Sequence, residues 1–564
     1  MLVGLLWLGS SRVGLTQIRL GPPPPPPVQT PTPQPLPIPP PEDLLIPQAP
    51  IAPPEPTDIQ PSLEESSEKI TVQAFQFEGN TVFSQEELAA VVQSFTQRSL
   101  TFEELLQARS AITQFYVDRG YVTSGAYIPP QTLENGIVVI QIIEGSLEAI
   151  NVTVDGKLNP NYVSDRLWLA GTTPLNIPRL LEALQLLQLN PIIDNISAQL
   201  AASTEPGQSI LDVSVQAARS FYPSIILDNG RNPQVGSFRR GGTLEEINLS
   251  GNGDRLTGTY LNTDGSDEID LGYSLPITPQ NTTINLSFRN ITSEIIEYPF
   301  SLLDLHSDYQ KYTIGVRHPL WQTPYHEFVL GLAFSHQTSS TTLLGSPFPS
   351  RGTDIEGNIR LSTLSFSQEW LQRSETDVLA LRSEFDLGIN AFNTTVPFDA
   401  PYNLDTPNSN YFLWRGQGQW VHLLGPDFLF LTRFNLQVAN STLPSLEQFA
   451  LGGLGSVVGY RQNTLLTDNG AFAAVELRVP LYRIPEEKAV LQLIPFVNWG
   501  TGWNHQTPDP DINTLASVGL GLQWQHGKNF SARIDWGKRL GKIPYIKGNS
   551  WQDDGIIFSV IFTP

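Results

Sequence analysis

Few residues of this chain have the type and spacing needed for chemistry. Its seven histidines are scattered over 564 residues, and the nearest pair, His318 with His326, lacks the spacing of a metal site. The glycines within Gly452–Gly459 do not fit the G-x-G-x-x-G pattern of a phosphate-binding loop, and no helical pattern follows them. The absence of cysteine excludes thiolate metal ligands, disulfides and cysteine nucleophiles. The sequence therefore predicts a protein without catalytic residues, metal or cofactor, and not an enzyme.

The same glycines lie in a segment whose length indicates a functional loop. About thirty residues, 440–470, separate two clean strand patterns, Phe428–Ala439 and Ala471–Val479. A loop of this length without its own helix or strand pattern is usually functional. Its glycines permit a tightly folded hairpin, and Tyr460 would give that hairpin an amphipathic tip. We expect the loop to fold back into the interior formed by the strands.

Residues 219–564, which contain this loop, alternate apolar and polar residues with the period of β-strands. In Phe428–Ala439, for example, Arg433, Asn435 and Gln437 share the polar face. About sixteen segments of about ten residues fill the region, as a membrane barrel with a polar lumen requires. The last segment, Ile556–Phe562, ends in an aromatic residue. A soluble β-rich adhesin is the alternative, because the strands of a sandwich alternate too.

Two smaller α/β patterns precede the barrel. In residues 70–145 a strand at Ile70–Phe77 is followed by capping boxes beginning at Ser84 and Thr101, which start two helices. In residues 146–218 the helices are expected at Pro160–Ala170 and Pro178–Leu189, with strands before and after them. Each region therefore predicts one small domain of two helices on a short sheet.

The N-terminal part predicts an export signal and a spacer. Residues 1–20 contain the short apolar run Leu2–Leu8 and are interpreted as a possible signal peptide, although they have no basic start and no clear cleavage site. Residues 21–69 form a proline-rich linker that opens with Pro22–Pro27. Such a segment favours the polyproline II conformation and acts as a semi-rigid spacer.

The net charge narrows the possible partners. Lys and Arg total 33 against 55 Asp and Glu, which gives a net charge of −22. A charge of this sign argues against nucleic acid as a partner. No window of the sequence approaches the ~18 apolar residues of a membrane helix. A protein with these strands crosses a membrane only as a closed barrel.

Together, these elements resemble the outer-membrane transporters of two-partner secretion, of the hemolysin secretion/activation type. That family combines α+β periplasmic POTRA-like domains with an all-β transmembrane β-barrel of about 16 strands. It carries a V-R-G-Y/F motif on a loop folded into the barrel and an F-x-D-x-G motif on a barrel strand. The matching residues here are Val457, Val458, Gly459 and Tyr460 for the first motif, and Phe496, Asn498 and Gly500 for the second.

Both charged positions of these motifs are neutral in this chain. In the resembled family the motif arginine pairs with the motif aspartate; the corresponding residues here are Val458 and Asn498. Removing one partner of a buried ion pair costs roughly 3–5 kcal/mol, whereas removing both can be close to neutral. The paired loss is thus consistent with two segments that touch. Arg461 is a possible substitute contact, reaching Asn498 or Glu476; alternatively it is a solvated charge in the lumen.

The resemblance implies an outer-membrane translocator with its N-terminal domains in the periplasm. These domains would bind an unfolded secreted protein by β-augmentation, and the loop would close the pore until the substrate arrives. Membrane lipid would surround the barrel, and neither nucleic acid nor nucleotide would be a partner. Two alternatives share this architecture: a factor that assembles and inserts outer-membrane proteins, and a passive porin whose degenerate loop no longer gates.

Overall fold

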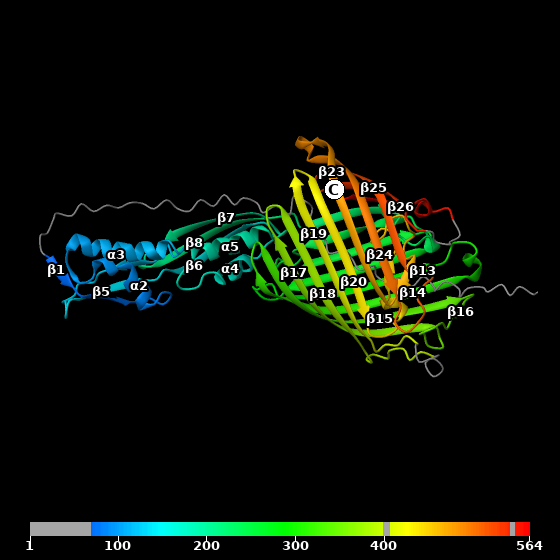
Figure 1. Ribbon diagram of the computed structural model, residues 1–564, viewed down its shortest axis with the longest axis horizontal. Coiled ribbons are helices and arrows are strands. Elements are labelled where there is room, and N and C mark those ends of the chain that lie inside the picture. The colour runs from blue at the N-terminus through cyan, green and yellow to red at the C-terminus, as the bar shows by residue number, and fades with distance from the viewer. Residues whose placement is uncertain (1–68, 399–405, 542–547) are drawn as a thin grey trace, which may run out of the picture.

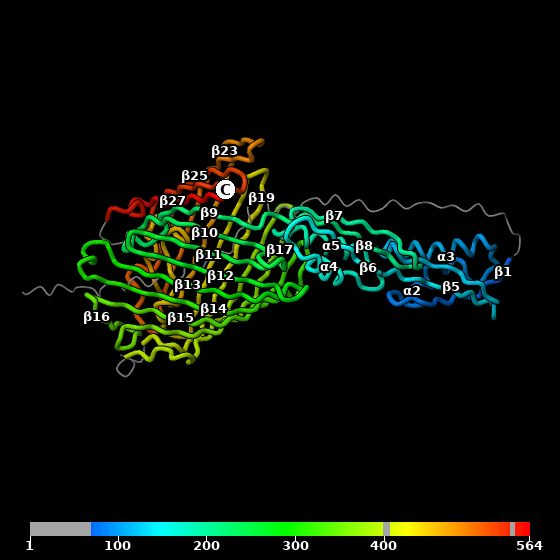
Figure 2. Tube along the Cα trace, turned by 180° about the vertical axis from the view of Figure 1, so that it is seen from behind, coloured from blue at the N-terminus to red at the C-terminus, as the bar shows by residue number. Residues whose placement is uncertain are grey.

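The computed structural model describes residues 69–398, 406–541 and 548–564. Two small α/β units stand in a row at one end of a large closed barrel (Figure 1), and the view from behind shows the same arrangement (Figure 2). The predicted signal peptide, 1–20, and all of the predicted linker except Lys69 lie outside the described residues.

The first unit packs α2 (Gln85–Val91) and α3 (Phe102–Val117) on a three-stranded sheet of order β2-β5-β4. Both helices begin at the predicted capping boxes, in which Ser84 and Thr101 each accept a hydrogen bond from the backbone N–H three residues later. Its strands and 3-10 turn are β1 (Lys69–Val72), β2 (Ala74–Glu78), η1 (Gln93–Phe95), β3 (Arg98–Thr101), β4 (Gly125–Tyr127) and β5 (Ile137–Ile143).

One prediction for this unit is wrong in part. The strand expected at Ile70–Phe77 is divided at Gln73 into β1 and β2. The two halves pair with different partners, because β1 lies antiparallel to β3 whereas β2 lies parallel to β5. The alternation of buried and exposed side chains shifts by one residue at the break, since Gln73 and Ala74 are both exposed between the buried Val72 and Phe75.

The second unit repeats the plan with α4 (Pro160–Trp168) and α5 (Ile177–Gln188) on a sheet of order β6-β8-β7. Strands β6 (Ser146–Asp155) and β8 (Gln208–Ala217) are parallel, and β7 (Ile193–Ala202) forms an antiparallel hairpin with β8. Apolar residues from both helices and all three strands form its core. Among the described residues, no helix combines the length and apolar character that crossing a membrane demands.

Contacts at two barrel turns fix the second unit against the barrel. The guanidinium of Arg166 lies over the ring of Tyr162 at 3.5 Å, and its Nε and Nη2 donate to Asn281 Oδ1 at 3.0 and 2.8 Å. At the neighbouring turn, Asn248 Nδ2 donates to the carbonyl oxygen of Lys157 at 2.8 Å. This end of the barrel is called the near end below.

Within the described residues, sixteen antiparallel strands close the barrel, with the two-residue β16 (Ser346–Pro347) beside β15. The C-terminal strand completes the ring by pairing with the first, from Ser559 with Asp228 to Phe562 with Ile225. The strands are β9 (Phe221–Asp228), β10 (Arg239–Ile247), β11 (Arg255–Thr263), β12 (Ser266–Pro276), β13 (Thr283–Glu294), β14 (Leu305–Gln322), β15 (His326–Leu343), β17 (Asn358–Arg373), β18 (Asp377–Ile389), β19 (Phe412–Gly425), β20 (Phe428–Ala439), β23 (Asn469–Ile484), β24 (Ala489–Trp503), β25 (Thr514–His526), β26 (Phe530–Arg539) and β27 (Ile556–Phe562).

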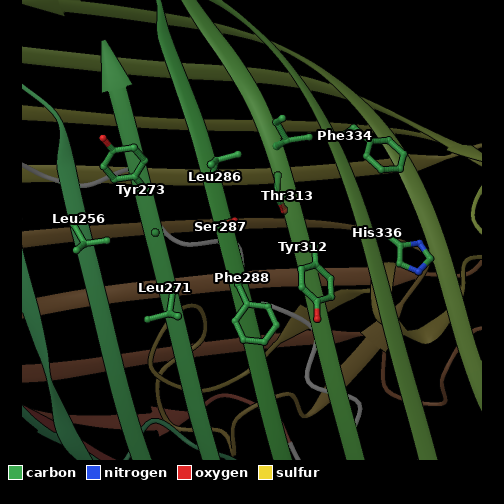
Figure 3. Close-up of a pocket in the computed structure, with 12 residues that line it drawn as sticks. Leu256, Leu271, Tyr273, Leu286, Ser287, Phe288, Tyr312, Thr313, Phe334 and His336 are labelled. Carbon is green, nitrogen blue, oxygen red and sulfur yellow. The ribbon is translucent and has the colours of Figure 1, made fainter. Parts of the chain in front are cut away.

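The outer face of the wall is apolar. Figure 3 shows a shallow groove on this face, over β11–β15, lined by side chains such as Leu271, Phe288 and Tyr312. Leu271 and Tyr312 are about half exposed, at 47% and 50%, although both are large and apolar. An exposed apolar band around a closed barrel is the surface that a bilayer covers.

The inner face is polar and carries ion pairs between strands, as the alternation predicts. Arg382 pairs with Glu369 on the neighbouring strand at 3.0 Å, and Arg433 pairs with Glu476 at 3.2 Å. Gln437, expected to line an open lumen, is only 2% exposed. The reason is that the loop after β20 covers it: Gln437 Nε2 donates to the carbonyl oxygens of Glu447 and Asp468.

Candidate functional site

The loop between β20 and β23 enters the barrel from the far end, opposite the α/β units. It contains η4 (Ser445–Glu447) and a short antiparallel hairpin of β21 (Phe449–Leu451) and β22 (Leu465–Thr467). Positive φ angles at Gly452, Gly453 and Gly459 allow the chain to turn sharply between the two hairpin strands. Most of its apolar side chains are buried.

The first part of the loop contacts one wall of the lumen. Leu446 packs with apolar side chains of β13, β14 and β17, including Ile291 and Tyr309. The carboxylate of Glu447, which is 6% exposed, accepts hydrogen bonds from Arg415 on β19 and Gln337 on β15. A buried carboxylate needs partners of this kind, so the contact fixes η4 on this wall.

The middle of the loop contacts the opposite wall at the two motifs. Val458 packs against Phe496 on β24 and Ile557 on β27. In the amide orientation that satisfies both of its polar atoms, Asn498 accepts a hydrogen bond from the Val458 N–H at 3.2 Å and donates to the Val497 carbonyl oxygen at 3.2 Å. The two neutral motif residues therefore touch through a backbone-to-side-chain hydrogen bond.

The other motif residues lie in the same contact. Val457 and Tyr460 are 0% and 2% exposed, and both belong to an apolar cluster that includes Leu451 of the hairpin. The Tyr460 hydroxyl donates to the Ala516 carbonyl oxygen on β25 at 3.0 Å. A Cβ at Gly500 would lie 2.8 Å from Leu451 Cδ2, so only glycine leaves room for this side chain at the wall.

Three glycines allow the loop to approach the wall backbone to backbone. A Cβ at Gly459 would lie 2.7 Å from the Gly537 carbonyl oxygen of β26, and a Cβ at Gly537 would lie 2.6 Å from the Val458 carbonyl oxygen. Gly555, just before β27, is equally restricted by Gly537. Any side chain at Gly459 or Gly537 would push the loop away from this wall.

The partners predicted for Arg461 are wrong. The partners predicted for it were Asn498 or Glu476, but its guanidinium pairs bidentately with Glu297 at 2.9 and 3.0 Å and with Asp553 at 2.9 Å. Its side chain is 17% exposed, so the alternative of a solvated charge does not describe it either. The physical reason is that Tyr460 inserts into the wall of β25 and Arg461, the next residue, extends toward the far end.

Several residues of this site were missed in the sequence. Gly537 interrupts the polar face of its strand, and this was the one signal that could have identified it. Leu446, Glu447 and Asp553 lie in single 3-10 turns and Glu297 lies in a connection, and none of these segments is long enough for a periodic pattern to show which way a side chain points.

A cluster that could hold a metal lies elsewhere, at the far rim. Glu294, Asp304 and His306 bring their ligand atoms within 4.8 Å of one another, but all three side chains are exposed. His306 Nε2 and Asp304 are already paired at 2.9 Å. We assign no metal to them.

Comparison with known proteins identifies the family to which this chain belongs. The family described as Haemolysin secretion/activation protein ShlB/FhaC/HecB matches residues 207–524, and the ShlB-type POTRA domain matches residues 70–145. The chain belongs to the haemolysin secretion/activation protein family. It is an outer-membrane transporter of two-partner secretion, with POTRA domains in the periplasm and a sixteen-stranded barrel that translocates an exoprotein.

Individual relatives of the transporter are similar over most of its length. The outer membrane transporter CdiB of Dickeya dadantii (strain 3937) is 20% identical over 468 residues, which cover 80% of each chain. The heme/hemopexin transporter protein HuxB of Haemophilus influenzae is 24% identical over 477 residues, covering 81% of this chain and 80% of HuxB. The structure of CdiB from Escherichia coli has the same fold, with a TM-score of 0.69, 20% identity and coverage of 90% and 93% of the two chains.

Proposed function

We propose that the loop of residues 440–470 is the plug of this transporter and must leave its position for the exoprotein to pass. One observation carries the proposal: the same loop contacts both sides of the lumen. Leu446 and Glu447 lie on the β13–β19 wall, whereas Val458 and Tyr460 lie on the β24–β27 wall. A polypeptide moving through the barrel would have to displace this bridge.

The POTRA domains supply the first contact with an unfolded exoprotein in this proposal. Each three-stranded sheet leaves two edge strands, β2 and β4 in the first domain and β6 and β7 in the second. An extended segment can add to such an edge through main-chain hydrogen bonds, which require no particular sequence. The fixed docking of the second domain on the barrel would then deliver that segment to the near end of the lumen.

A deletion strain tests the transport part of the proposal by quantitative proteomics of the culture medium and the outer membrane. We expect the loss of one or a few secreted proteins while other outer-membrane barrels remain at their usual level. A general fall of outer-membrane barrels would instead identify an assembly factor. An unchanged medium and outer membrane would leave a passive porin.

A cysteine pair tests the plug part, because the natural chain contains no cysteine that could interfere. Leu451→Cys and Gly500→Cys place two thiols at the contact between the hairpin and β24. In the deletion strain, the oxidised pair should block secretion and a reductant should restore it. The single variant Leu451→Cys, which puts a smaller side chain beside Gly500, is the matched control and should secrete under both conditions. Secretion through the oxidised barrel would contradict the proposal.

A further inference from the structure

Beside the motif, the loop makes a charged contact with the far end of the barrel. At the motif, the polar links between loop and wall are two neutral hydrogen bonds, from the Val458 N–H to Asn498 at 3.2 Å and from the Tyr460 hydroxyl to the Ala516 carbonyl oxygen at 3.0 Å. The residue after Tyr460, Arg461, makes charge-assisted hydrogen bonds to two carboxylates. Bonds of this type are roughly twice as strong as neutral ones, and the bidentate geometry adds specificity.

The two carboxylates lie on different segments at the far end of the barrel. This end is extracellular, because the periplasmic POTRA domains stand at the near end. Glu297 is in the connection between β13 and β14, and Asp553 is in η6 (Trp551–Asp554), between β26 and β27. These residues are 164 and 92 positions away from Arg461 in the sequence. One side chain of the loop therefore joins two parts of the extracellular rim.

The rim side of this contact is already ordered. Asp553 is buried, and its Oδ2 also accepts hydrogen bonds from the backbone N–H groups of Gly548 and Ser550 at 3.1 and 3.3 Å. The next loop residue is held in the same way, since the Gln462 N–H donates to Gln552 Oε1 at 2.8 Å. Little conformational freedom is lost when Arg461 binds to a carboxylate fixed in this manner.

We propose that Arg461 is the outer latch of the plug: its pairing with Glu297 and Asp553 holds the loop in the lumen, and its release precedes passage of the exoprotein. Arg461 is a positioning residue that acts through the loop and does not itself contact the substrate. The inference rests on the proposed role of the loop as the plug. The latch places control of the loop's release at the extracellular rim, whereas the charge pair of the family motifs would place that control inside the lumen.

Conductance of the purified full-length protein in planar lipid bilayers tests the latch without any exoprotein. For Arg461→Gln we expect the open fraction to rise by roughly 10- to 100-fold, since hydrogen bonds to charged groups contribute about 1.5–3 kcal/mol. Glu297→Gln with Asp553→Asn should produce a similar rise. Adding Arg461→Gln to that pair should change little more, because the same contact is already lost.

Arg360→Gln is the matched control. Arg360, near the start of β17, pairs at 2.8 Å with Asp354 in the connection before that strand, so this variant removes an arginine ion pair at the same barrel end. Equal conductance of Arg461→Gln and Arg360→Gln would overturn the latch. If Arg461→Gln fails to fold, as judged by heat-modifiable migration in detergent gels, Arg461→Lys keeps the charge, loses the bidentate geometry and should open to an intermediate degree.

The outcomes separate the latch from the plug. If the oxidised cysteine pair blocks secretion but Arg461→Gln leaves the channel closed, the latch is wrong and the plug stands. If Arg461→Gln opens the channel but the oxidised pair still secretes, the loop moves under control of Arg461 and is not the barrier to the exoprotein.

Discussion

Restoring the family's charge pair would show how the neutral motif works. Val458 and Asn498 are 6% and 3% exposed, and Val458 is enclosed by Phe496 and Ile557. Val458→Arg alone places an unpaired cation in this contact, and Asn498→Asp alone places an unpaired anion there. Each single change should cost roughly 3–5 kcal/mol of loop docking, which corresponds to about a 100-fold or larger shift toward the released loop.

The double variant, Val458→Arg with Asn498→Asp, should recover most of that loss because each charge then has its partner. The assay is the open fraction of the channel in planar bilayers, measured for the original protein, the two single variants and the double variant. We expect a coupling free energy of about 2–5 kcal/mol between the two positions. Additive effects, with a coupling below about 0.5 kcal/mol, would refute the inference that these side chains share one buried contact.

Three further predictions concern other parts of the protein. Gly459→Ala should release the loop, because a φ of +104° is strained for alanine and the new Cβ would lie 2.7 Å from the backbone of β26. The control is Gly345→Ala, where φ is +72° and the new Cβ would have no atom within 4 Å. The open fraction of the channel is measured for both variants. In the first POTRA domain burial raises the pKa of Glu144, but hydrogen bonds from Thr81 and Tyr116 lower it below the usual 4.5. The stabilisation by this carboxylate is therefore present above about pH 4.5 and is lost as the pH falls through the lowered value; hydrogen exchange of α3, corrected for the intrinsic rate, should show this loss and Glu144→Gln should abolish it. Arg166→Ala should broaden the distance distribution between spin labels on the second domain and on the barrel, whereas Arg98→Ala, in a half-exposed ion pair of the first domain, should leave it narrow.

Regular elements were predictable because their signals are local. Alternation placed β20 at Phe428–Ala439 and β27 at Ile556–Phe562, which are the bounds observed. The capping boxes at Ser84 and Thr101 fixed two helix starts, because a cap forms between residues three apart. The break between β1 and β2 was missed although the alternation shifts by one residue at Gln73–Ala74; the change of partner from β3 to β5 is visible only in the structure.

The candidate site divides in the same way. Length and glycine content identified the loop, and the motif residues Val457–Tyr460 and Phe496–Gly500 meet in the structure. The partners of Arg461 were not predictable, because an irregular loop has no period that sets the direction of a side chain. Likewise, nothing near Glu447 in the sequence indicates that its carboxylate accepts a hydrogen bond from Arg415 on β19.

By itself, the sequence determined that this chain has two α/β units, a barrel with a polar lumen and a long loop whose two motifs lack their charges. Only the tertiary structure decided that the loop bridges the lumen and that Arg461 joins it to the extracellular rim. Strand periodicity and helix caps depend on residues that are near neighbours in the chain, so they can be recognised in short stretches of sequence. The contacts of the loop join residues as far apart as Arg461 and Glu297, and closure of the barrel alone brings those residues together.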